Sequence, residues 1–407
     1  MKREVSGDSR RNFIKKSVAG LTGVAVLPSI LKGAEPEKNR KIIHRTLGKT
    51  GLKLPIVSMG VMNADNPNLV RTALDAGIVH LDTAWGYQQG KNEEMIGEVV
   101  KGRPRDSFVI ATKIWEPRDR ATGLFPKEAT AATFLEKFAT SLKRLQMDYV
   151  EILYLHSISK KESALFAPYI EVMQKLKKEG RIRFIGISTH MNEPEVIRAA
   201  ADSGVYDVVL TAYNFRQEHR QAVKEAIAYA AGKGLGIVAM KTQAGIYWDD
   251  KEKKLPIDMK AALKWALQDE NVHTAIPGFT TFDQMELDLT VMESLALTDK
   301  EKENLIEPAK SADVKVSMTG LYCQQCASCL PQCPAKLEIP TLMRSYMYAY
   351  GYKNLGLAKQ TLEETGIATM PCNQCHTCSV TCRMGFDIKA RALDIARLHA
   401  VPQDFLV

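Results

Sequence analysis

The sequence predicts two folded domains: an α/β barrel of eight parallel strands and eight helices, followed by a small, cysteine-rich helical domain. Two observations lead to this prediction. Between residues 41 and 300, short apolar runs alternate with amphipathic segments, the pattern of repeated strand–helix units. All eight cysteines then fall within residues 323–382, in two copies of one spacing. A chain of 407 residues is long enough for both domains.

Composition places the chain among soluble globular proteins, with 45% apolar and 25% charged residues. The net charge is +8, but it is unevenly distributed. Residues 1–40 carry nine Lys and Arg against four acids, a net of +5, which leaves +3 for the rest of the chain. Because no basic surface is indicated outside the N-terminus, nucleic-acid binding is not expected.

Residues 1–40 are interpreted as a targeting signal followed by a linker. The stretch Ser9–Lys15 contains Arg10-Arg11 before an apolar pair and a lysine, which resembles the twin-arginine export motif. Ser17–Leu31 is uncharged, but its fifteen residues rise only about 22 Å as a helix, against ~30 Å of membrane hydrocarbon. We therefore expect a periplasmic protein, or one tethered to the inner membrane if the signal is not cleaved. A basic N-terminal arm is the alternative.

Residues 41–300 are expected to form the barrel. Eight apolar runs are candidate strands: Ile56–Gly60, Val79–Asp82, Phe108–Lys113, Val150–His156, Phe184–Ser188, Val208–Ala212, Gly236–Met240 and His273–Ile276. Helical patterns lie between them, for example Ala131–Leu145, Glu171–Glu179, Glu193–Ala201, Gln221–Lys233 and Met259–Leu267. Eight such units within about 250 residues predict a (β/α)8 TIM barrel, whose active site lies at the carboxyl ends of the strands.

Polar residues stand at those strand ends. Asp82, Lys113 and His156 close the second, third and fourth strands, and Tyr87 lies five residues past Asp82. A tyrosine can donate a proton if a nearby ammonium stabilises its phenolate. Lys113 could do so, with Asp82 holding the lysine and His156 steering a substrate carbonyl. Each residue alone could be a solvated rim residue or part of a structural ion pair, but four on successive strands favour a catalytic site.

The cysteines predict two iron–sulfur clusters. Both copies have the spacing Cys-x2-Cys-x2-Cys-x3-Cys, in which three cysteines hold one cluster and the fourth reaches the other. We expect Cys323, Cys326, Cys329 and Cys382 on one [4Fe–4S] cluster, and Cys372, Cys375, Cys378 and Cys333 on the second. Zinc usually takes two ligand pairs, and cysteines this dense are poor disulfide partners.

Residues 301–407 are expected to form the second domain. Two helices are predicted between the cysteine motifs, at Ile339–Tyr350 and Leu355–Glu364. Pro340 suits a first helical turn and Gly351 a helix end. This arrangement resembles the α-helical ferredoxins of respiratory enzymes, so we expect a ferredoxin-like domain.

The barrel segment resembles the aldo-keto reductase family. The resemblance covers residues 45–300 and rests on Arg45–Leu52, His80–Ala84, Gly86–Tyr87, Ala111–Lys113, Asp148–Tyr149, Leu153–His156, Gly180–Ser188, Tyr213–Asn214 and Ile276–Gly278. It implies the family's catalytic tetrad at Asp82, Tyr87, Lys113 and His156. It also implies a nicotinamide cofactor, with Ser188 at the carboxamide and Tyr213 stacked on the ring. The C-terminal cysteines resemble the ferredoxin-carrying branch of this family.

Departures from the family pattern affect cofactor choice. Thr189 and Leu210 replace the usual Asn and Gln near the carboxamide. Where NADP-dependent members commonly place Lys and Arg around the 2′-phosphate, this chain has Gly278 and Gln284. Without cations a 2′-phosphate is poorly compensated, so NAD(H) is favoured over NADP(H). Asp288 lies near the position of the acid that often binds the adenine end.

Three functions follow from these patterns. The first is an exported oxidoreductase that interconverts an alcohol and a carbonyl, with the clusters serving a redox partner protein. The second is an ordinary nicotinamide-dependent reductase whose iron–sulfur domain is a structural or docking module. The third is an electron-transfer protein with a vestigial barrel, against which the complete tetrad argues.

Overall fold

The computed structural model describes residues 41–119, 122–243, 258–310, 323, 328–350, 355–383, 385–402 and 405–406. Lys41–Val407 forms one compact unit. The expected export signal and Cys326 lie outside the described residues. No described helix combines the length and the apolar character that a membrane crossing needs.

The centre of the barrel is an eight-stranded sheet in which all neighbouring strands are parallel. Its strands are β3 (Met59–Gly60), β4 (His80–Asp82), β5 (Val109–Ile114), β6 (Val150–Leu155), β7 (Ile182–Thr189), β8 (Val208–Ala212), β9 (Gly236–Met240) and β10 (Thr274–Ala275). Spatial order follows chain order throughout, as expected when each strand returns through an outer helix.

The sheet closes on itself between β3 and β10. Val57 pairs with Ala275 in a parallel bridge, and the amide N of Gly60 donates to the carbonyl O of Pro277 at 3.0 Å. The predicted (β/α)8 barrel is therefore present. The first and last strands are shorter than the sequence predicts, because this seam is held by isolated bonds and not by a continuous ladder.

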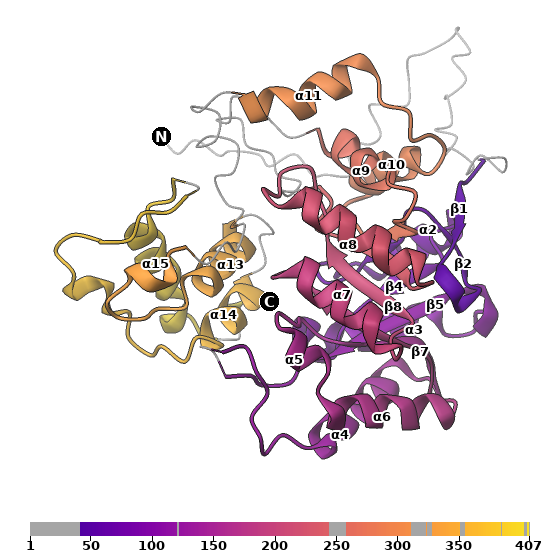
Figure 1. The fold of residues 1–407 in the computed structure, drawn as a ribbon, viewed down its shortest axis with the longest axis horizontal. Helices are drawn as coiled ribbons and strands as arrows, with labels where there is room; N and C mark the ends of the chain where they lie inside the picture. Colours follow the sequence, from indigo (N-terminus) through magenta and orange to yellow (C-terminus); the bar gives the residue numbers. More distant parts are fainter. Residues whose placement is uncertain are drawn as a thin grey trace, which may run out of the picture. The chain divides into compact units, whose positions relative to one another are not determined.

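Helices surround the sheet (Figure 1). They are α2 (Pro67–Asp75), α3 (Lys91–Val100), α4 (Ala131–Leu145), α5 (Lys161–Ala164), α6 (Ala167–Lys178), α7 (Glu193–Ser203), α8 (Arg220–Gly232), α9 (Met259–Leu267), α10 (Phe282–Val291) and α11 (Asp299–Lys310). The apolar faces of α2 to α10 pack on the outside of the sheet and form the main core, because an amphipathic helix buries its apolar stripe against the nearest apolar surface. The last helix, α11, contacts α9.

A second, smaller core fills the barrel interior. It includes Leu47, which follows β1 (His44–Thr46), and Leu54 within β2 (Lys53–Pro55), the two strands of a hairpin, together with inward residues such as Ile152 and Leu210. The barrel is thus packed with side chains at this end, and polar groups are left to the carboxyl ends of the strands.

The C-terminal segment has its own hydrophobic core. It contains α13 (Ile339–Tyr350), α14 (Leu355–Glu363) and α15 (Ile388–Ala396), and the short turn η5 (Pro371–Gln374) carries Cys372. Apolar residues of all three helices, such as Leu342, Leu362 and Ile395, gather with the buried Cys329 and Cys372. The two helices predicted between the cysteine motifs match α13 and α14 closely.

Candidate active site

Three neighbouring strands bring the expected polar residues to one edge of the barrel. Asp82 is the last residue of β4, Lys113 lies near the end of β5, and His156 directly follows β6. The amide N of His156 donates to the carbonyl O of Ile114 at 3.0 Å, which continues the β5–β6 pairing and fixes the position of His156. Tyr87 opens the turn η2 (Tyr87–Gly90) that follows β4.

The four side chains meet around the Lys113 ammonium. Its Nζ donates to Asp82 Oδ1, to the carbonyl O of Thr83 at 2.7 Å and to the Tyr87 hydroxyl at 3.4 Å. The Tyr87 and His156 rings meet edge to face, with centroids 6.1 Å apart and planes at 79°. Asp82 is 1% and Lys113 2% exposed, so their ion pair is almost fully removed from water.

Burial keeps the Tyr87 phenol protonated. It raises the pKa of Tyr87 above its usual value, and the negative charge of Asp82 raises this pKa further. The sequence led us to expect the opposite direction. The difference arises because burial disfavours the charged phenolate, and because Lys113 is already paired with Asp82, whose negative charge also acts on Tyr87. In this environment Tyr87 is a proton donor rather than a phenolate.

His156 is a neutral imidazole at this site. Burial holds its pKa well below the usual range, and the positive charges of Lys113, Arg118 and Arg344 lower the pKa further. A neutral imidazole beside a phenol can donate or accept one hydrogen bond to orient a carbonyl without adding charge.

The two residues expected to contact the nicotinamide, Ser188 and Tyr213, lie in different environments. Ser188 Oγ accepts a hydrogen bond from the amide N of Ser157 at 2.8 Å, at the carboxyl end of β7. The Tyr213 ring belongs to the core between sheet and helices, where it lies 5.0 Å from the Trp265 ring and its hydroxyl donates to Asp269 at 3.4 Å. The structure therefore brings Ser188 close to the strand ends but packs Tyr213 among outer side chains.

Gly278 and Gln284 follow β10 and bring no cation to this region. Gln284 Oε1 accepts from the amide N of Thr280 at 2.8 Å, so its side chain stabilises the loop before α10. Asp288 is fully buried and accepts a hydrogen bond from Gln243 Nε2 at 3.1 Å. His190, which directly follows β7, is hydrogen-bonded to Ser157 Oγ at 2.9 Å.

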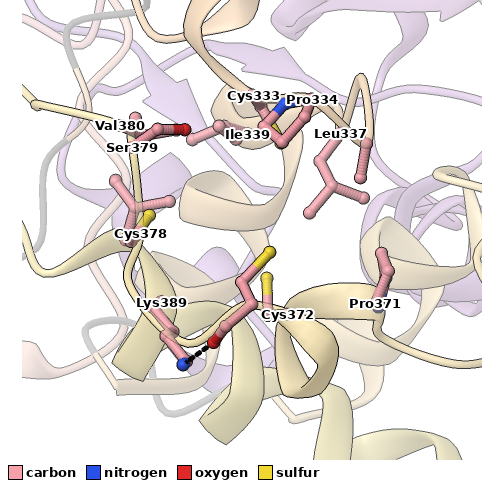
Figure 2. A pocket seen from close by; sticks show the side chains of 13 residues that line it. Cys333, Pro334, Leu337, Ile339, Pro371, Cys372, Cys378, Ser379, Val380 and Lys389 are labelled. Carbon is pink, nitrogen blue, oxygen red and sulfur yellow. Dashed lines mark hydrogen bonds between the residues drawn. The ribbon is translucent and has the colours of Figure 1, made fainter.

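One pocket gathers the four cysteines assigned to the second cluster. Cys333, Cys372, Cys375 and Cys378 all line it, although Cys333 comes from the first motif. Figure 2 shows Cys333 on a different side of this pocket from Cys372 and Cys378. The crossed assignment predicted from the spacing is thus compatible with the chain's path.

The described cysteines are free thiols, which iron–sulfur clusters require. The cysteines of the described part of the chain, Cys323, Cys329, Cys333, Cys372, Cys375, Cys378 and Cys382, form no disulfide. Within the same part, no three His, Cys, Asp or Glu side chains converge on one point that a single metal ion could occupy. In a [4Fe–4S] cluster each thiolate binds its own iron, so the ligands stand further apart than around zinc.

Residues of the C-terminal segment contact the barrel beside the active site, which sequence reasoning did not foresee. Gln360 Nε2 on α14 donates to the carbonyl O of Gly86, the residue before Tyr87, at 3.5 Å. Arg383, which follows Cys382, forms an ion pair of 3.1 Å with Glu218 in the loop after β8. Burial raises the pKa of Tyr348 on α13 to about 12.

Comparisons with known proteins match the two parts of the chain separately. The model of the aldo/keto reductase family matches residues 54–260, and that of a 4Fe-4S dicluster domain matches residues 322–387. L-galactose dehydrogenase of Arabidopsis thaliana is 27% identical over 67% of this chain and 96% of its own. D-threo-aldose 1-dehydrogenase of a Pseudomonas species is 27% identical over 46% of this chain and 66% of its own.

Solved structures give the same picture for the barrel. The holo form of aldo-keto reductase AKR11C1 from Bacillus halodurans superposes with a TM-score of 0.54 and 25% identity. It covers 65% of this chain and 95% of the other. The similarity therefore extends over the barrel part of this chain and almost the whole of that protein.

Proposed function

Because this chain belongs to the aldo/keto reductase family and acts on CH–OH and C=O groups, we propose that it couples alcohol–carbonyl interconversion to electron transfer through two [4Fe–4S] clusters. A redox partner protein supplies or removes the electrons. The observation that carries this proposal is the hydrogen bond between Gln360 and Gly86, since it seats the cysteine-rich segment against the turn that holds Tyr87.

The residues at the strand ends account for the proton in the reaction. In carbonyl reduction the Tyr87 hydroxyl gives its proton to the carbonyl oxygen, and Lys113 at 3.4 Å stabilises the charge that develops on the phenol. Asp82 keeps the lysine in place, and neutral His156 orients the carbonyl. When bound, a nicotinamide supplies or accepts the hydride.

The nicotinamide site has groups suited to it. The Asn214 Nδ2 amide is buried and, within the described part of the chain, has no hydrogen-bond partner, which leaves a donor for a ligand's amide oxygen. Ser188 stands at the neighbouring strand end. With Gly278 and Gln284 where other members carry cations, we propose NAD(H) in preference to NADP(H).

Electron counting supports a role for both clusters. Oxidation of one alcohol would pass two electrons as hydride to NAD+, and reoxidation of the bound NADH would release a proton and give one electron to each of the two [4Fe–4S] clusters. Cys323 acts electrostatically on Lys241, which directly follows β9 at the carboxyl edge of the barrel, and Arg383 beside Cys382 pairs with Glu218. We therefore propose that the cluster of Cys323, Cys326, Cys329 and Cys382 faces the barrel, and that the cluster of Cys333, Cys372, Cys375 and Cys378 serves the partner.

Stopped-flow absorbance tests the coupling. The anaerobic protein with oxidised clusters is mixed with NAD+ and a panel of aldoses, which includes L-galactose because related enzymes are named for such sugars. Bleaching of the cluster absorbance that Tyr87→Phe suppresses supports the proposal. Turnover with unchanged cluster absorbance instead supports the second candidate, a reductase whose cysteine-rich domain only docks or stabilises.

We also propose that the protein is exported by the twin-arginine route. The support is the Arg10-Arg11 pair and the uncharged stretch after it. Replacing both arginines by lysine is expected to leave the protein in the cytoplasmic fraction, as measured by immunoblotting of fractionated cells. Arg3→Lys, outside the pair, is the control and should not change export. Equal export of all three forms contradicts the proposal.

A further inference from the structure

The turn η2, which begins at Tyr87, has an unusual backbone. The three residues after Tyr87, namely Gln88, Gln89 and Gly90, all have left-handed φ values, of 49°, 56° and 94°. Glycine adopts this conformation readily, but the side chains of two successive glutamines disfavour it. Such conformations persist only where the surrounding structure holds them. The position of Tyr87 therefore depends on the groups that hold this turn.

The side chain of Arg144, near the end of α4, contacts the chain on both sides of Tyr87. Its Nη1 donates to the carbonyl O of Trp85 at 2.8 Å, two residues before the tyrosine. At the other end of the turn, its guanidinium occupies the place that a larger residue would need, since a Cβ atom added at Gly90 would lie 2.2 Å from Arg144 Cζ. One guanidinium thus spans the turn.

A buried carboxylate fixes this guanidinium. Glu93 Oε2 accepts a hydrogen bond from Arg144 Nη1 at 3.3 Å, and Glu93 Oε1 accepts one from the Thr112 hydroxyl at 2.7 Å. The glutamate side chain is 0% exposed and that of the arginine 20%, so water competes little for these charge-assisted bonds. Because Thr112 directly precedes Lys113 on β5, the ion pair ties the turn to the strand that carries the catalytic lysine.

A close approach of two helices brings Arg144 to this position. A Cβ atom added at Gly97 on α3 would lie 2.7 Å from the carbonyl O of Arg144 and 2.9 Å from that of Leu145. A larger residue at Gly97 would force the end of α4 away from α3 and withdraw the arginine from the turn. Gly97 therefore makes room for the backbone of Arg144, and Gly90 makes room for its side chain.

We propose that Arg144 is a positioning residue, which holds η2 in its left-handed conformation and so keeps the Tyr87 hydroxyl beside the Lys113 ammonium. The role of Tyr87 as proton donor rests on the proposed function, whereas the hold on the turn does not. The turn has a second anchor, because Gln88 Nε2 donates to the carbonyl O of Met62 at 3.0 Å. Removal of the arginine should therefore loosen the turn without unfolding it.

Chemical rescue tests the effect on the reaction. With NADH and any aldehyde that the wild type reduces, Arg144→Ala should lower kcat by about tenfold or more and change KM less, because the proton donor is displaced while the substrate contacts remain. Guanidinium chloride, far below denaturing concentrations, should restore part of kcat, and sodium chloride at equal ionic strength should not. Arg103→Ala is the control, because Arg103 forms a comparable ion pair with Asp75 beyond the opposite end of α3.

Further variants separate the hold on the turn from the buried charge. Removal of Arg144 leaves Glu93 as an unpaired carboxylate inside the protein, which destabilises the fold. In a Glu93→Gln background no such charge remains, so the further loss of kcat caused by Arg144→Ala measures the hold on the turn. Arg144→Lys keeps the charge, but its side chain is one bond shorter and lacks the planar group beside Gly90. It should keep the fold and still lose kcat severalfold.

Amide hydrogen exchange of residues 85–91 measures the turn without turnover. Exchange should be several times faster in Arg144→Ala and in the double variant than in the wild type and Arg103→Ala. Unchanged exchange in both arginine variants, or a kcat equal to that of the Glu93→Gln parent in the double variant, overturns the proposal. If exchange becomes faster but the wild type reduces no carbonyl compound, the proposed function fails and the hold on the turn stands.

Discussion

The ammonium of Lys113 lies 3.4 Å from the hydroxyl of Tyr87, although the two residues belong to different strand–helix units of the barrel. Lys113 is anchored at the same time by Asp82 and by the carbonyl of Thr83. The lysine therefore has a fixed position from which it can stabilise a phenolate as the proton leaves. The resting tyrosine stays protonated, because burial and the negative charge of Asp82 both raise its pKa.

Tyr87→Phe should lower turnover of carbonyl substrates by about 10² to 10⁴, because it removes the proton donor and leaves the ring in place. Steady-state kinetics measures this effect. Tyr229→Phe is the control: Tyr229 is exposed and its hydroxyl bonds to Asp202 at the surface. Full activity of Tyr87→Phe would assign the proton to another group.

Cys333→Ser should remove the cluster proposed for Cys372, Cys375 and Cys378, whose pocket Cys333 also lines although it belongs to the other sequence motif. Cys382→Ser should remove the remaining cluster. Each variant is expected to retain about four of about eight iron atoms per chain, and their EPR spectra should differ from each other. If Cys333→Ser and Cys329→Ser give the same residual spectrum, the ligands are not crossed.

Two cations on α15 should set the potentials of the two clusters separately. Lys389 lines the pocket of Cys372 and donates to the carbonyl O of Cys375. Arg391 interacts electrostatically with Cys382 and Cys323. A nearby positive charge favours the reduced, more negative cluster.

Lys389→Met should therefore lower the potential of the Cys372 cluster by on the order of tens of millivolts, and Arg391→Met that of the other cluster. Redox titration followed by EPR measures both potentials in each variant. The exposed Arg397→Met serves as the control. If either variant shifts the potentials of both clusters equally, the prediction that each cation sets the potential of one cluster is wrong.

His80→Gln should reduce the loss of stability at acidic pH. His80 is fully buried beside Ser58 Oγ at 3.1 Å, and burial and the charge of Lys113 lower its pKa to about 3. As pH falls below about 6.5, the unfolded chain gains a proton at this position that the folded protein does not, so folding loses about 1.4 kcal/mol per pH unit.

Glutamine has no such proton uptake and can keep the hydrogen bond to Ser58. Relative to the wild type, the variant should therefore gain about 2 kcal/mol between pH 7 and pH 5. Urea denaturation at the two pH values, followed by tryptophan fluorescence under anaerobic conditions, measures this difference. If the difference in free energy of unfolding between the two proteins does not change with pH, His80 becomes protonated in the folded state as it does in the unfolded chain.

Periodicity was enough to predict the barrel, because parallel strands buried on both faces read as apolar runs and the intervening helices as amphipathic segments. The strands at the seam, β3 and β10, were predicted too long. Their apolar residues are buried as in a regular strand, but closure of the sheet limits the regular pairing, and closure is not encoded in any local pattern.

The sequence by itself determined which residues stand at the strand ends and how the cysteines are spaced, since both depend on positions along the chain. Tertiary structure alone decided that Tyr87 is held protonated, because burial and the negative charge of Asp82 both raise its pKa. It also decided that Tyr213 packs against Trp265 and that the charge of Arg344 lowers the pKa of His156. Such relationships join residues far apart in the chain, and their strength depends on burial and distance, which only the folded protein sets.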